Sequence, residues 1–245
     1  MKKKGRRNSY ASGILMTCMS VITVLMFSMP VGALTQSPPY AIGSAGCTDA
    51  GTPGYGYVDH YVVPWARYSD GHFGSETAPN FRGVGLSGAY RQCTASMSFN
   101  GPNFNPASTK SYLIVATWNF NWHQRLKMWG GFGTPCSGYA RCDIDVKMNV
   151  YSVTHSQWLT GDLVIHIADH TRTAVGNYEI SYEGSMGSTG TYWNLETGHQ
   201  YYCMAKVTCF GYLYSGTYPT YVSEAWARND IWRSGDATLV SFTIT

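Results

Sequence analysis

Two stretches of this 245-residue chain alternate strictly between apolar and polar side chains, and this alternation is the strongest constraint on the fold. From Cys142 to Val150 every second residue is apolar, and from Ser111 to Trp122 every even-numbered residue is apolar or aromatic. Successive side chains of a β-strand point to opposite faces, so a period of two predicts a strand with one buried face. The polar positions of the first stretch are Asp143, Asp145, Lys147 and Asn149.

Further segments carry β-branched, aromatic and small residues between clusters of Gly, Asn and Pro, which is typical of strands. No stretch shows a convincing apolar period of 3.6 residues, as an amphipathic helix would. We therefore expect an all-β fold, an antiparallel β-sandwich. The further strands are predicted over Tyr57–Trp65, Gly83–Phe99, Leu163–Ala168, Tyr178–Tyr182, Tyr201–Tyr212 and Thr238–Ile244.

Residues 1–33 have the pattern of an export signal. Five Lys and Arg precede an uncharged apolar run from Gly13 to Met29, and Val31, Gly32 and Ala33 offer a small-residue cleavage site. We expect a secreted or cell-surface protein. If this signal stays uncleaved, the uncharged run is long enough to span a bilayer, and we expect membrane contact through this segment only.

Export also changes the charge balance. Without the five basic residues of the signal, 12 Lys and Arg remain against 14 Asp and Glu, a formal charge of −2. The remaining charges are sparse and interspersed, so the sequence gives no basis for nucleic acid as a partner. We expect an extracellular glycan or protein partner instead.

The chain beyond the signal divides by composition. Residues 34–56 are rich in Pro, Gly, Ser and Ala without a hydrophobic period, which predicts a flexible leader. Residues 57–245 are expected to form the sandwich domain. The loop-like composition of residues 100–109 makes this segment the best candidate for an internal boundary, with 110–245 as a second part.

The C-terminal part carries a recognisable pattern. Gly198 and Tyr201 follow Leu195 by three and six residues, and Cys203 lies two residues after the tyrosine. This resembles the tyrosine corner of immunoglobulin-like and fibronectin type III-like domains, in which the tyrosine hydroxyl hydrogen-bonds back to the preceding turn. The resemblance covers about residues 138–245 and implies an immunoglobulin-like sandwich.

Six cysteines remain after the signal, and an even number in an oxidising compartment predicts a disulfide-stabilised fold. The immunoglobulin resemblance implies a bridge between Cys142 and Cys203. If two disulfides joined a pair of neighbouring antiparallel strands, Cys136 would also pair with Cys209, and this second pairing stays open. Cys47 and Cys93 would then form the third disulfide by elimination.

Catalytic and metal motifs are weak in this sequence. His166 and His170 have a helical metal-ligand spacing but lie in a strand-like segment, about 13 Å apart along it. Asp143 and Asp145 share a strand face without a calcium-loop pattern, which favours solvated surface residues. We therefore name no catalytic residue, no metal ligand and no cofactor.

Aromatic side chains are the remaining functional candidates. Exposed and coplanar rings would stack on sugars, whereas a strand with aromatic residues opposite Asn is more often a buried face. The candidate platform consists of Trp118, Trp122, Trp158 and Trp193.

These observations favour a binding, adhesion or envelope-structural β-sandwich, with carbohydrate as a candidate ligand and without catalysis. The alternative is an exported hydrolase of polysaccharide or cell-wall material, which a cleft with two close carboxyl groups would favour. A third class is an inhibitor or toxin-like effector that presents one exposed loop, such as Ser69–Phe81 or Tyr212–Tyr221.

Overall fold

The computed structural model describes residues 33–51, 57–82, 90–130, 137–175, 178–215, 222–231 and 237–245. Residues Thr35–Thr245 form one compact unit. The predicted export signal, except for its last residue, lies outside the described residues. No helix among the described residues is long and apolar enough to cross a membrane.

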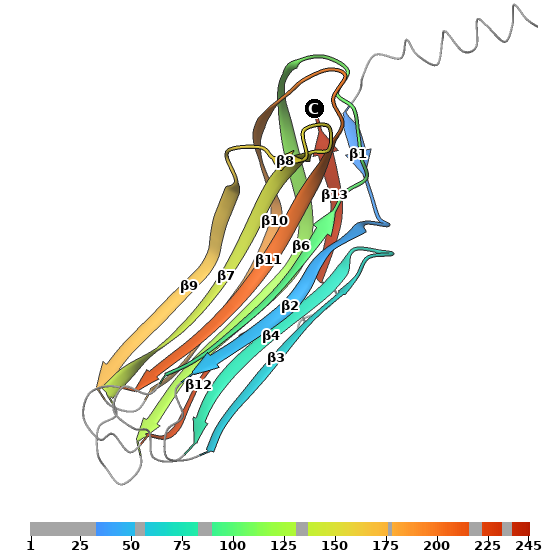
Figure 1. Ribbon diagram of the computed structural model, residues 1–245. Coiled ribbons are helices and arrows are strands. Elements are labelled where there is room, and N and C mark those ends of the chain that lie inside the picture. The colour runs from blue at the N-terminus through green and yellow to red at the C-terminus, as the bar shows by residue number, and fades with distance from the viewer. Residues whose placement is uncertain are drawn as a thin grey trace, which may run out of the picture. The chain divides into compact units, whose positions relative to one another are not determined.

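The described strands form two antiparallel sheets that pack face to face (Figure 1). This confirms the all-β sandwich. The first sheet has seven strands in the order β1 (Leu34–Gln36), β13 (Ala237–Ile244), β4 (His72–Arg82), β12 (Val222–Asp230), β6 (Lys110–Gly130) and β10 (Tyr178–Leu195), with β3 (Tyr57–Arg67) beside β4. The second sheet has six strands in the order β2 (Ala41–Gly51), β5 (Tyr90–Asn100), β11 (Tyr201–Ser215), β7 (Ser137–Ser152) and β8 (Gln157–Trp158), with β9 (Leu163–Val175) beside β7.

The two alternating segments line the interior as predicted. On β6 the even-numbered side chains from Tyr112 to Met128 are at most 9% exposed, and on β7 those from Cys142 to Val150 are at most 1% exposed. Each fully buried aliphatic or aromatic side chain contributes about 1.5–3 kcal/mol of transfer free energy. The two strands therefore supply the facing halves of the core.

A polar layer interrupts this core. Trp122 belongs to the larger apolar cluster and Leu126 to a smaller one, and the buried Gln124 lies between them on the same face of β6. The Oε1 atom of Gln124 lies 2.6 Å from Nδ1 of His170 on β9. The His170 ring also stacks on Tyr182 of β10 at 3.6 Å between centroids. These contacts join the two sheets through polar groups.

The segment predicted as a flexible leader, residues 34–56, contains β1 and β2. Strand β2 pairs with β5 from Ala41 to Gly51, while most of its side chains are exposed. Backbone hydrogen bonds along a sheet edge need no apolar period in the side chains. The composition of this segment therefore does not indicate the edge strand that it forms.

Residues 100–109 do not separate two units. Strand β5, before this loop, pairs with β11, and β4 pairs with β12 and β13, so both sheets contain strands from both sides of the loop. The loop itself is held by a bridge between Phe104 and Tyr201. Strands from both sides of the candidate boundary thus share both sheets.

The segment Ser69–Phe81, considered above as an exposed loop, contains most of strand β4. Phe73, Ser75 and Thr77 are completely buried on this strand. The small polar residues and the proline of β4 do not predict a strand, because strands are recognised in a sequence by β-branched and aromatic side chains.

The immunoglobulin-like disulfide between Cys142 and Cys203 is wrong. Strands β7 and β11 are antiparallel neighbours, but their register places Cys142 opposite Gly211 and Cys203 opposite Val150. The two cysteines therefore lie eight residues apart along the strands, about 27 Å. In immunoglobulin domains the two cysteine strands belong to different sheets, whereas β7 and β11 share one.

The other cysteines do not form the expected framework either. Cys47 is exposed and lies opposite Ala95, while the buried Cys93 lies opposite Asp49. No disulfide joins the cysteines within the described residues, so the prediction of a disulfide-stabilised fold is not supported. Cys136 lies outside the described residues.

The tyrosine corner, in contrast, is present. The backbone N–H of Glu196 donates a hydrogen bond to the hydroxyl of Tyr201 at 3.2 Å, as the resemblance implied. Gly198 adopts a φ of 82°, which favours glycine. This turn leads the chain from β10 in one sheet to β11 in the other.

Replacing Gly184 of β10 tests the packing between adjacent strands. Gly184 lies opposite Trp122, and an added Cβ atom would come within 2.3 Å of the indole ring. We expect Gly184→Ala to lower the free energy of unfolding by about 1–3 kcal/mol in urea titrations. Gly187→Ala is the matched control, because no atom other than those of its chain neighbours lies within 4 Å of its Cβ position. Equal stability of the two variants would contradict this packing.

Thiol reactivity tests the cysteine arrangement. Burial raises the pKa of the Cys209 thiol to about 12 and raises that of Cys203 well above its usual range. Because the thiolate is the reactive form, we expect iodoacetamide to modify Cys47 rapidly in the native protein and Cys142, Cys203 and Cys209 only after unfolding. Mass spectrometry of the alkylated peptides measures this. A peptide containing Cys142 linked to Cys203 would overturn the register.

Candidate functional site

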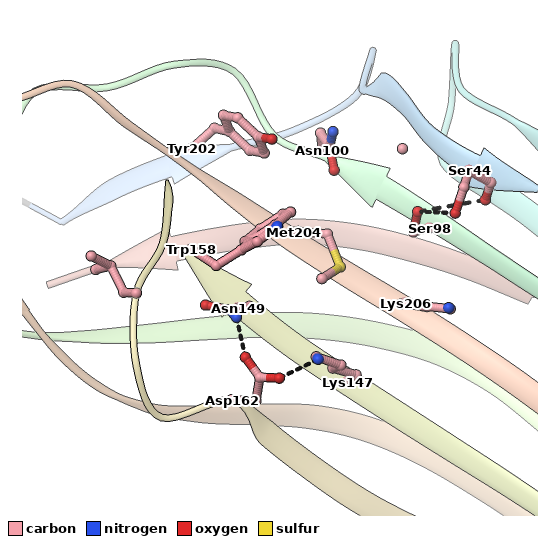
Figure 2. Close-up of a pocket in the computed structure, with 12 residues that line it drawn as sticks. Ser44, Ser98, Asn100, Lys147, Asn149, Trp158, Asp162, Tyr202, Met204 and Lys206 are labelled. Carbon is pink, nitrogen blue, oxygen red and sulfur yellow. Dashed lines mark hydrogen bonds and ion pairs between the residues drawn. The ribbon is translucent and has the colours of Figure 1, made fainter. Parts of the chain in front are cut away.

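A hollow of about 480 Å³ lies on the outward face of the six-stranded sheet (Figure 2). Its floor consists of outward side chains of β5, β11 and β7, and its rim includes the edge strand β2 and the segment from β8 to Asp162. The strand period decides which side chains reach it. The inward residues of β7 and β11 fill the core, so the residues between them face outward.

Two aromatic rings, those of Trp158 and Tyr202, line the hollow, and the Tyr151 ring packs against both. Tyr151 and Tyr202 are cross-strand partners whose rings stack at 5.0 Å between centroids. Trp158 pairs with Tyr151 through β8 and meets both rings edge-on, at 5.0 and 5.9 Å. Trp158 is still 44% exposed. It therefore combines a fixed orientation with a ring that a ligand can reach.

The β8 segment holds Trp158 in place. The backbone N–H of His155 donates to Oγ of Ser152 at 3.2 Å in the turn after β7. The N–H of Leu159 then donates to the carbonyl of Val150 at 2.9 Å. These bonds on both sides of β8 tie the tryptophan to β7.

Hydrogen bonds also fix the polar wall of the hollow. Asp162 accepts a hydrogen bond from the Asn149 amide and forms an ion pair with Lys147 (Figure 2). The Oδ1 atom of Asn149 accepts from the backbone N–H of Val150 at 2.6 Å. Asn149 is therefore bonded at both ends of its amide, and Asp162 is held against the floor.

Other polar groups of the floor have fewer partners. The Oδ1 atom of Asn100 is buried and accepts no hydrogen bond from the described residues. Ser98 contacts Ser44 across the strand pair β5–β2, with 3.1 Å between the hydroxyl oxygens. Figure 2 shows Lys206 on the same strand as Met204 and Tyr202. The hollow thus combines an aromatic end with amide, hydroxyl and ammonium groups.

The predicted aromatic platform does not form. Trp118, Trp122 and Trp193 are 2%, 9% and 3% exposed and pack in the core of the sandwich. They lie on inward positions of β6 and β10, so the period that marked them as a face also buries them. Trp158 alone of the four lines the hollow.

The two histidines of β9 point to opposite faces of the sheet. His166 is exposed, with Nδ1 2.7 Å from Oδ1 of Asp145, whereas His170 contacts Gln124 inside the sandwich. The register shifts between Ile144 and Asp145 of β7, and this β-bulge reverses the alternation of β9. The metal spacing is therefore not realised. No group of three or more His, Cys, Asp or Glu side chains in the described ranges is arranged to hold a metal ion.

Carboxyl groups meet elsewhere on the same outward face. Asp143 lies opposite Asp169, and burial together with this second carboxyl raises the pKa of Asp143. Arg141 counteracts the effect through ion pairs with Asp143 at 2.8 Å and Asp169 at 3.7 Å. Asp143 is six residues from Asn149 along β7, about 20 Å from the hollow.

A second aromatic group occupies the far end of this face. Tyr139 and Tyr212 stack at 5.2 Å between centroids, and Tyr90 and Tyr214 stack against them at 5.9 and 5.5 Å. Burial and the Tyr139 hydroxyl raise the pKa of Tyr212 to about 12. These rings pack on one another across three strands.

Most residues that line the hollow lie outside the set of predicted site residues. Tyr151 continues the polar parity of Asp143 to Asn149, and Lys206 has the opposite parity to the buried Cys203. Parity is therefore the signal that could have indicated the outward face for both residues. No residue pattern indicates that Asn100 and Asp162 join them, because β5 and the β8–β9 connection come together only through the sheet register.

Comparison with known protein families gives no match to any family model, and comparison with curated proteins gives no match either. Among solved structures, a crystal structure of the enzymatically active domain of tailspike protein 4 from bacteriophage CBA120 aligns with 84% of this chain and 20% of that chain. The sequence identity is 9% and the TM-score is 0.23. Such an alignment carries no argument about activity.

Titration of the two histidines tests the bulge. The hydrogen bond and charge of Asp145 raise the pKa of His166, while burial lowers that of His170. We expect ¹H–¹³C NMR titration to give the higher pKa for His166, and Asp145→Asn to lower this pKa while leaving that of His170 unchanged. The stabilising effect of the His166–Asp145 pair is then full below the ordinary histidine pKa and lost as the pH rises through the raised one. Equal pKa values for the two histidines would contradict opposite faces.

Proposed function

We propose that this protein is an exported, non-catalytic binding protein that holds a carbohydrate in the hollow at Trp158. The observation that carries this proposal is the partly exposed Trp158 ring, fixed against Tyr151 and Tyr202 at one end of a concave polar site. Ligand sites commonly combine a concave shape with aromatic contacts and a few oriented polar groups.

The chemistry of the hollow matches a sugar on two counts. The C–H face of a pyranose ring is apolar and packs on an aromatic ring, which Trp158 offers beside Tyr202. Sugar hydroxyls both donate and accept hydrogen bonds. Asp162 is an acceptor held in place by Asn149.

Export supports the choice of an extracellular ligand. The basic and apolar pattern of residues 1–33 is typical of a signal peptide, and a glycan is an abundant partner outside the cell. We propose a secreted or cell-surface location on this ground. Membrane contact then occurs only through the N-terminal segment, if it is retained.

The hydrolase alternative has one observation in its favour, the facing carboxyl groups of Asp143 and Asp169. These groups lie about 20 Å along β7 from Asn149 and share Arg141 as a counter-ion. Asp162, the acid that lines the hollow, is bound to Lys147 and Asn149. A glycosidase needs two carboxyls flanking one bond, so the geometry of the hollow favours binding.

Replacing Trp158 tests the binding site. We expect Trp158→Ala to weaken glycan binding by about tenfold or more, because the variant loses the one exposed ring of the aromatic end. Isothermal titration calorimetry with the best binder of a glycan array measures the loss. Tyr192→Ala is the matched control, since Tyr192 is 66% exposed on the other sheet and does not line the hollow.

Two results would contradict this proposal. One is unchanged affinity in Trp158→Ala when circular dichroism shows the variant folded. The other is hydrolysis of the bound glycan that Asp143→Asn abolishes, which would establish the hydrolase instead.

A further inference from the structure

The floor of the hollow contains two lysines that face each other. Lys147 of β7 and Lys206 of β11 are direct cross-strand partners, and both side chains line the hollow. Like charges at directly opposite positions of a sheet destabilise the pair. Such an arrangement requires counter-charges to offset the repulsion.

The protein supplies a counter-charge for only one of the two. Asp162 forms an ion pair with Lys147, and its second oxygen accepts from Asn149. Within the described ranges, Lys206 forms no ion pair. The side chains that line the hollow therefore include two ammonium groups and one carboxylate, which leaves a net positive charge.

We propose that the ligand is an acidic oligosaccharide whose carboxylate or sulfate group binds the ammonium of Lys206. This inference rests on the proposed function and names the class of glycan. An ammonium offers three donors, and its hydrogen bonds to an anionic oxygen are about twice as strong as neutral ones. Partial burial in the hollow strengthens the attraction further, because water screens it less.

The positions of the groups fit one ligand chain. Tyr202 and Lys206 lie four residues apart on β11, about 14 Å between their Cα atoms. Met204 lies between them, opposite Asn100. One sugar ring stacked at Trp158 can thus belong to the same short chain as the acid group at Lys206.

The experiment is an array of oligogalacturonates, hyaluronan and heparan sulfate oligosaccharides together with neutral cello-, malto-, xylo- and chito-oligosaccharides, probed with the whole exported chain. We expect acidic members to bind at least about tenfold more tightly than neutral ones, as one charge-assisted hydrogen bond implies. This preference should decrease as the salt concentration rises from about 50 to about 500 mM, because salt screens an ion pair that is partly exposed to water. Methyl esterification removes the negative charge of the oligogalacturonate carboxylates. Comparing these oligosaccharides with their methyl esters therefore shows whether a carboxylate, rather than a sulfate, is the bound group.

Variants of Lys206 complete the test. We expect Lys206→Gln to abolish the preference for acidic glycans and Lys206→Arg to retain most of it. Lys110→Gln is the control, because Lys110 lies on the other sheet and does not line the hollow. A wild-type protein that binds neutral and acidic members equally would overturn this inference and leave the proposed function intact. Absence of all glycan binding would overturn both.

Discussion

Strand β6 is the element on which the rest of this structure depends. It runs for 21 residues, about 70 Å, and pairs with β10 along one side and with β13 and then β12 along the other. Its inward side chains from Tyr112 to Met128 are all buried. A strand of this length must bury its apolar face over its whole course, so the opposite sheet has to present matching apolar positions.

Strand β7 meets this requirement, and the hollow beside Trp158 is a consequence. With Cys142, Ile144, Val146, Met148 and Val150 packed inward, the alternation turns Lys147, Asn149 and Tyr151 outward. Strand β11 does the same with Tyr202, Met204 and Lys206. The residues that form the core and those that form the hollow are therefore the two faces of the same strands. The short β8 then adds Trp158 to a face that would otherwise be a flat sheet surface.

Register and irregularity decide which groups of this face meet. An eight-residue offset separates Cys142 from Cys203, although both lie on adjacent antiparallel strands. One bulge between β7 and β9 turns His166 to solvent and the half-buried His170 toward Gln124 of the other sheet. Neither the register offset nor the bulge can be predicted from residue spacing. Spacing gives the distance along one strand and not its alignment with the next strand. The tyrosine corner was predictable because its hydrogen bond between Tyr201 and Glu196 is local.

The sequence by itself determined the all-β class, the buried faces of β6 and β7 and the local turn at Tyr201, since these depend on a period of two and on neighbouring residues. Tertiary structure decided the rest. It brought the predicted leader into the sheet as β2, placed polar β4 among buried strands, and put three of four candidate tryptophans in the core. It also assembled Asn100, Trp158 and Lys206 from three separate strands. The physical reason is that strand pairing satisfies backbone groups through partners far along the chain, and these partners choose which side chains become neighbours.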